Sequence, residues 1–111
     1  IQARSMISLV DDDPDTLNAT ASLVRSLGYE VMTFESGRIF LDWNGLPETW
    51  CVITDLVMPE IDGIELQRLL KLKGFRMPII ILTATTDDAV RRRLMLDGAH
   101  EILTKPCTET V

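Results

Sequence analysis

Cysteine is scarce in this chain of 111 residues, which contains only Cys51 and Cys107. Two cysteines this far apart provide neither a disulfide framework nor a four-ligand zinc site. No apolar run approaches the roughly 20 residues that a membrane-spanning helix needs. The N-terminus also lacks a basic segment followed by an apolar stretch, the pattern of a secretory signal. We therefore expect a cytoplasmic protein with reduced cysteines and no membrane partner.

An excess of positive charge is missing as well. The formal net charge is −6, and no basic patch has aromatic residues interleaved with it. Because nucleic-acid surfaces carry clustered lysine and arginine, this chain is not expected to contact DNA or RNA itself. Apolar residues make up 46% of the sequence, which is ample for one hydrophobic core. We expect a single domain over residues 1–111.

Short apolar strands and amphipathic helices alternate along the chain. Asp13 and Pro14 suit the start of a helix, and Gly28 suits its end. The run 78–82 is apolar throughout, which is typical of a strand buried on both faces. The pattern predicts strands at 6–10, 30–34, 50–54, 78–82 and 101–104, helices at 13–28, 36–43, 62–73 and 87–98, and a loop at 45–47.

Strict alternation of strands and helices predicts an α/β fold, a doubly wound five-stranded parallel sheet with right-handed crossovers. We expect the flavodoxin-like strand order 2-1-3-4-5. In such sheets the loops after the strands form the functional edge, and ligands bind where the first and third strands lie side by side.

Acidic, hydroxyl and basic side chains stand at the predicted strand ends, namely Asp11, Asp12, Asp55, Thr83 and Lys105. Two carboxylates about 4 Å apart repel by roughly 4 kcal/mol at an effective dielectric near 20. Three converging carboxylates therefore need protonation or a cation. A hard divalent cation, Mg²⁺ or else Mn²⁺, would supply the charge. Carboxylates, a lysine and a hydroxyl together suit a phosphoryl group.

In this order the residues resemble the receiver domain of bacterial two-component response regulators. The resemblance covers almost the whole chain, and its strength lies in the full set of motifs at the right strand ends. The matching residues are Asp11 and Asp12, Asp55, Met58–Pro59, Asp62–Gly63, Thr83 followed by Ala84, and Lys105–Pro106.

The resemblance implies a signalling role. Asp55 would accept a phosphoryl group from a sensor histidine kinase, and Lys105 and Thr83 would bind the phosphoryl oxygens. Such a domain is a switch and not an enzyme, because it assists only its own phosphorylation and dephosphorylation. The implied Mg²⁺ ligands are Asp11, Asp12, Asp55 and the backbone carbonyl of Val57. The implied structural residues are Pro59, Gly63 and Pro106, the last after a cis peptide bond.

The implied output is a changed surface on the fourth helix and fifth strand, caused by inward movement of the Thr83 hydroxyl. In this family an aromatic residue three positions before the lysine usually moves with the threonine, but Ile102 occupies that position here. Implied partners are the kinase, an output domain or effector protein, and a second copy bound through this surface. The segments 34–37 and 40–41 resemble receivers attached to helix-turn-helix DNA-binding domains, which implies by analogy alone that the parent protein is a transcriptional regulator. Only residues 107–111 follow Pro106, so the family's fifth helix, which would cover strands one and five, is missing or truncated.

Two other functions remain open. Asp11 and Asp13 match the first element of a haloacid-dehalogenase-type phosphatase that depends on Mg²⁺, although Asp55 would then go unused. A receiver-like binding module that is never phosphorylated is the other alternative.

Several residues also have simpler structural readings. Asp13 fits a helix cap, and Arg91, Arg92 and Arg93 fit a solvated helix face or a docking patch. Trp43 and Trp50 are expected to pack against the side of the sheet that carries the second helix.

Overall fold

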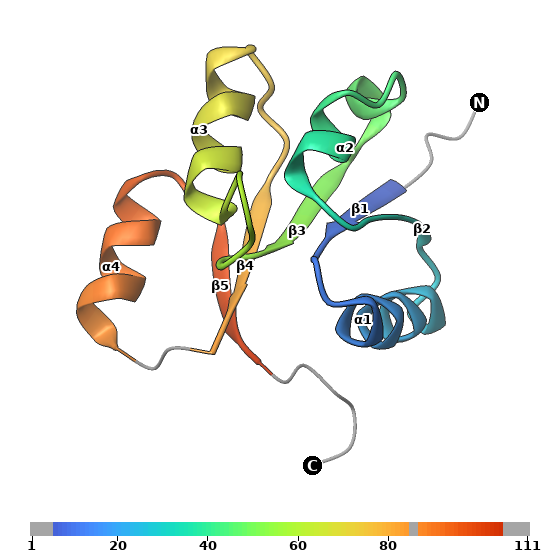
Figure 1. Ribbon diagram of the computed structural model, residues 1–111, viewed down its shortest axis with the longest axis horizontal. Coiled ribbons are helices and arrows are strands. Elements are labelled where there is room, and N and C mark those ends of the chain that lie inside the picture. The colour runs from blue at the N-terminus through green and yellow to red at the C-terminus, as the bar shows by residue number, and fades with distance from the viewer. Residues whose placement is uncertain (1–5, 85–86, 106–111) are drawn as a thin grey trace.

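Five parallel strands form the central sheet of this protein, whose structure is a computed structural model that describes residues 6–84 and 87–105 (Figure 1). The strand order is β2-β1-β3-β4-β5. The doubly wound α/β fold with flavodoxin-like order is therefore confirmed. The strands are β1 (Met6–Val10), β2 (Glu30–Phe34), β3 (Cys51–Asp55), β4 (Ile79–Thr83) and β5 (Glu101–Thr104).

Four α-helices and one short 3₁₀-helix connect these strands within the described ranges. Each α-helix begins after a residue whose side chain accepts a backbone N–H bond, which stabilises the first turn. These caps are Asp13, Ser36, Asp62 and Asp87, so the cap predicted at Asp13 is confirmed. The helices are α1 (Pro14–Ser26), α2 (Gly37–Leu41), η1 (Leu46–Glu48, the 3₁₀-helix), α3 (Gly63–Leu72) and α4 (Asp88–Leu96).

The second helix is shorter than predicted. It ends at Leu41, and the Trp43 amide bonds the Phe40 carbonyl three residues back, which tightens the chain out of α-helical geometry. The predicted loop at 45–47 instead contains most of η1. A segment with Gly45 and Pro47 favours such a tight turn over a continued α-helix.

The helices lie on both faces of the sheet. In Figure 1, α1 is on one side and α2, α3 and α4 are on the other. The larger core cluster joins buried residues of α2, α3 and α4 to the sheet, and Phe40, Leu66, Leu70 and Leu94 are among its members. The smaller cluster contains Leu17, Ala21 and Val24 of α1 with Ile7, Leu9 and Cys51 of the sheet. This packing fixes the carboxyl ends of all five strands at one edge.

The two tryptophans differ in their surroundings. Trp43 packs on Phe34 with 5.1 Å between ring centroids, as predicted. The prediction for Trp50 was wrong, because this side chain is 54% exposed and stacks on Tyr29 at 6.1 Å. Trp50 precedes β3, and its amide donates to the carbonyl of Met6, the first residue of β1. It therefore lies near the amino ends of these strands, away from the carboxyl ends. Among the described helices, none combines the length and apolar character of a membrane span.

Candidate functional site

The strand ends meet as predicted. Val10 pairs with Thr54, so Asp11, the residue after β1, lies beside Asp55, the last residue of β3. Asp55 pairs with Leu82, and Thr83 pairs with Thr104. Parallel pairing with little stagger therefore places four of the predicted positions, Asp11, Asp55, Thr83 and Lys105, in a row along one edge of the sheet.

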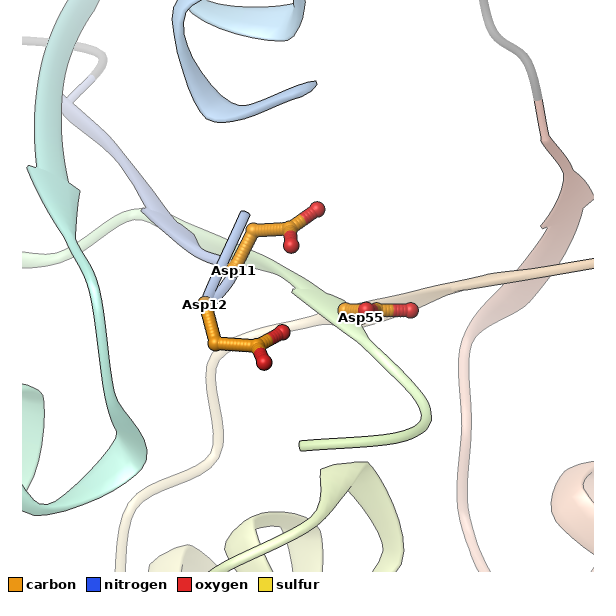
Figure 2. Close-up of side chains that lie close together, drawn as sticks. All are labelled: Asp11, Asp12 and Asp55. Atoms are coloured by element: carbon orange, nitrogen blue, oxygen red, sulfur yellow. The ribbon is translucent and has the colours of Figure 1, made fainter. Parts of the chain in front are cut away.

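Three carboxylates converge at this edge. Asp11 and Asp12 follow β1 and Asp55 ends β3, and one oxygen of each lies within 4.8 Å of the others. Figure 2 shows the side chains of Asp11, Asp12 and Asp55 close together where β1 and β3 end. Asp11 is buried, Asp55 is half-buried and Asp12 is exposed. Oxygen donors with one open side fit a hard divalent cation that keeps part of its hydration shell, as Mg²⁺ does.

Lys105 joins the carboxylates at the end of β5. Its Nζ lies 3.1 Å from Oδ2 of Asp11 and 3.2 Å from Oδ2 of Asp55. The other oxygen of Asp11 accepts a bond from the Asp13 amide at 3.0 Å. Asp11 is thus held from two directions, by the Lys105 ammonium and by the Asp13 amide.

Burial and charge together set the protonation of this cluster. The pKa of Asp55 is raised, chiefly because burial penalises its charged form and then because Asp11 repels it, while Lys105 opposes both effects. Burial alone would lower the pKa of Lys105, but its hydrogen bond and charge interaction with Asp11, helped by Asp55, raise it. The lysine therefore stays charged at neutral pH, and the Asp55 carboxyl takes up a proton at a higher pH than an aspartate in water does.

The raised pKa of Asp55 leads to a stability prediction. Folding is opposed by ionised Asp55, so this residue costs stability above its raised folded-state pKa, and the cost disappears as pH falls below the unfolded-state pKa. We expect Asp55→Asn without divalent cation to raise the unfolding free energy at pH 7 by roughly 1 kcal/mol, the size of like-charge repulsion near water. Chemical denaturation at pH 7 and below pH 4 measures this gain. A gain that persisted unchanged in acid would contradict the electrostatic cause.

The loop after Asp55 is shaped by close backbone contacts. Val57 is 75% exposed while Met58 is buried at 7%, so the methionine anchors the loop and the valine side chain faces solvent. The Pro59 carbonyl accepts from the Ile61 amide at 2.7 Å, and Glu60 has a positive φ of 69°. These contacts form a tight turn between Asp55 and α3.

Gly63 lets α3 begin directly against the end of β3. Its amide donates to the Leu56 carbonyl at 2.8 Å. A Cβ atom at this position would lie 2.7 Å from the Asp55 carbonyl oxygen and 3.0 Å from the Leu56 Cα atom. Glycine is therefore required here by close approach of two backbone segments.

The remaining predicted residues lie next to this cluster or outside the described ranges. Thr83 is buried at 3% at the end of β4, and its carbonyl accepts from the Lys105 amide at 2.8 Å. Ile102 is buried at 6% in the same core cluster as Leu94 of α4. Pro106 and its predicted cis bond lie outside the described residues.

Arg91 is the residue near this site that the sequence interpretation missed. Arg92 and Arg93 are exposed, but Arg91 is partly buried and bonds Thr104 and Ile102 of β5. The signal was present in the sequence, because Arg91 precedes the buried Leu94 by three residues and so shares its helix face.

Comparison with known protein families supports the receiver interpretation of this site. The model of the response regulator receiver domain matches residues 7–111. The chain belongs to the response regulator receiver family.

Curated relatives of this receiver chain include regulatory proteins of similar sequence. The response regulator protein TodT of Pseudomonas putida is 38% identical over 105 residues, which cover 95% of this chain and 46% of TodT. The transcriptional regulatory protein FixJ of Azorhizobium caulinodans is 35% identical over 101 residues, 90% of this chain and 47% of FixJ. The receiver chain thus spans less than half the length of these relatives.

Solved structures give the same fold. The structure described as FixJ-N has a TM-score of 0.83 and 28% identity, covering 99% of this chain and 87% of that one. The response regulator StyR has a TM-score of 0.82 and 38% identity, covering 94% of this chain and 52% of StyR. Family and fold support the receiver interpretation, and neither supports the phosphatase or unphosphorylated-module alternatives.

Proposed function

We propose that residues 1–111 form one receiver domain in which Asp55 is the phosphoacceptor. The observation that carries this proposal is the placement of Lys105 Nζ within 3.2 Å of Asp55 and 3.1 Å of Asp11, beside a three-carboxylate cluster. An ammonium here can bind an anionic group on Asp55, and the carboxylates can bind the cation that accompanies it. A sensor histidine kinase is the proposed phosphodonor.

The residues divide the reaction among them. An oxygen of Asp55 attacks phosphorus, the bond from phosphorus to the donor atom breaks, and the donor leaves with that electron pair. Lys105 and the hydroxyl of Thr83 bind oxygens of the transferred group. Asp11, Asp12, Asp55 and the Val57 carbonyl would hold Mg²⁺, which would supply positive charge to offset the charge that develops on those oxygens. Mn²⁺ can replace it because the ligand set is all oxygen.

The same groups would connect phosphorylation to a surface change. Thr83 ends β4 immediately before the connection to α4, and Ile102 of β5 packs in one cluster with Leu94 of α4. A phosphoryl group that draws the Thr83 hydroxyl inward would bias α4 and β5 between two arrangements. With Ile102 in place of an aromatic residue, the movement relies on Thr83 and the backbone.

The biological role follows from the relatives. We propose that the chain belongs to a cytoplasmic regulator whose output is transcription, since FixJ is named as a transcriptional regulatory protein. The output domain or effector, and not this domain, would contact DNA. A second copy could bind through α4 and β5, where Leu96 is 78% exposed. The domain would also assist hydrolysis of its own acyl phosphate.

Intact-mass spectrometry tests the proposal directly. The chain is incubated with acetyl phosphate and with or without Mg²⁺, in parallel with Asp55→Asn and Asp12→Asn variants. We expect one phosphoryl adduct on wild type that requires Mg²⁺, no adduct on Asp55→Asn, and a raised Mg²⁺ requirement for Asp12→Asn. An adduct that persisted in Asp55→Asn would contradict the assignment of the phosphoacceptor.

A further inference from the structure

Arg91 connects α4 to β5 through its guanidinium group. Nη1 donates to Oγ1 of Thr104 at 2.9 Å, and Nη2 donates to the carbonyl oxygen of Ile102 at 3.2 Å. A planar guanidinium that makes two such bonds has a defined position relative to the strand. Arg91 therefore binds the last residues of β5 from the side of α4.

The residue that follows Thr104 is Lys105. Its amide bonds the Thr83 carbonyl at 2.8 Å, and its Nζ lies between Asp11 and Asp55. In the described sheet β5 has four residues and pairs only with β4, so few backbone bonds fix its end. The two hydrogen bonds from Arg91 therefore restrain the end of β5 in addition to its pairing with β4.

We propose that Arg91 is a positioning residue for the reaction at Asp55, acting through β5 to keep the Lys105 ammonium in place. This inference rests on the proposed function, because it assigns Lys105 a part in phosphoryl transfer. It also means that α4 and Lys105 are mechanically connected. A shift of α4 would disturb the lysine, and a new bond to the lysine would act back on α4.

The chain offers a matched control at the next position. Arg92 is exposed on the same helix, and no hydrogen bond or ion pair of its side chain is found among the described residues. Arg92→Ala removes the same charge and a side chain of the same length as Arg91→Ala. Arg91→Lys keeps the charge but cannot reproduce the two-pronged contact.

A double-mutant cycle separates positioning from general structural support. Rates of adduct formation with acetyl phosphate and Mg²⁺ are compared for Arg91→Ala, Arg91→Lys, Arg92→Ala, Lys105→Ala and the Arg91→Ala/Lys105→Ala pair. We expect about a tenfold slower rate for both Arg91 variants, as for misplacement of a catalytic group, and a rate within about twofold of wild type for Arg92→Ala. In the Lys105→Ala background, Arg91→Ala should cause no further slowing. Equal slowing in both backgrounds, or none in either, overturns the proposal.

Hydrogen exchange tests positioning without phosphorylation. The Lys105 amide should exchange about tenfold faster in Arg91→Ala than in wild type, because its bond to Thr83 opens more often. Exchange in β1 and β3 should be unchanged, which also shows that the variant is folded, and Arg92→Ala should match wild type. Unchanged exchange at Lys105 in folded Arg91→Ala overturns the positioning role. If wild type forms no adduct, the proposed function fails while this measurement still decides the role of Arg91.

Discussion

Replacing Lys105 with methionine is expected to lower the unfolding free energy by about 2–3 kcal/mol, because removal of one partner leaves buried charge uncompensated. The lysine side chain is 21% exposed, and its two acidic partners are 4% and 13% exposed. Methionine keeps most of the side-chain volume and removes the ammonium. The loss is therefore electrostatic, and chemical denaturation at pH 7 measures it.

The pH dependence of this loss has a definite sign. In the variant, Asp11 and Asp55 repel without compensation, so the deficit is fullest where Asp55 is ionised and shrinks as pH falls through its raised pKa. Mg²⁺ should recover part of the deficit at pH 7. Lys73→Met is the control, since Lys73 is exposed, and it should stay within about 0.5 kcal/mol of wild type. A Lys105→Met deficit that did not change with pH would contradict the electrostatic account.

Gly63→Ala should cost about 2–3 kcal/mol for a steric reason, as overpacking against rigid neighbours does. The new Cβ would meet the Asp55 carbonyl oxygen at 2.7 Å and the Leu56 Cα atom at 3.0 Å, both in the backbone. Neither atom can turn aside as the end of a flexible side chain could. The start of α3 must shift away from β3, and the loop that carries Val57 must shift with it.

A second glycine provides the comparison for this prediction. Gly74 has a φ of +89° with nothing within 4 Å of an added Cβ, so Gly74→Ala should cost only about 1 kcal/mol for the left-handed backbone. Thermal unfolding of both variants ranks the two effects. If Gly74→Ala proved the more damaging, backbone conformation and not close approach would be the governing constraint.

Most of the fold could be predicted because its local signals agree. Apolar runs indicated the strands, and the cap at Asp13 indicated the start of the first helix. Strict alternation then left few arrangements of a parallel sheet. The positions of the strand ends follow from that arrangement, which is why the sequence alone predicts that Asp11 and Asp55 lie together.

The rest depended on contacts that a sequence does not display. The spacing from Arg91 to Leu94 indicates which arginine shares the buried helix face, but the bonds of Arg91 to β5 depend on how Leu94 packs against the sheet. Trp50 looks like a core residue in the sequence. In the structure it lies just before the amino end of β3, where it is exposed and stacks on Tyr29. The clash that excludes a side chain at Gly63 arises between segments whose separation is set by the whole fold.

The central claim is that Asp55 carries the phosphoryl group, and site mapping tests it most directly. Wild-type chain treated with acetyl phosphate and Mg²⁺ is reduced with borohydride, which converts an aspartyl phosphate to homoserine, and is then sequenced by tandem mass spectrometry. The account predicts homoserine at position 55 and an unchanged aspartate at positions 11 and 12. Homoserine at position 11, with Asp55 unmodified, would contradict it.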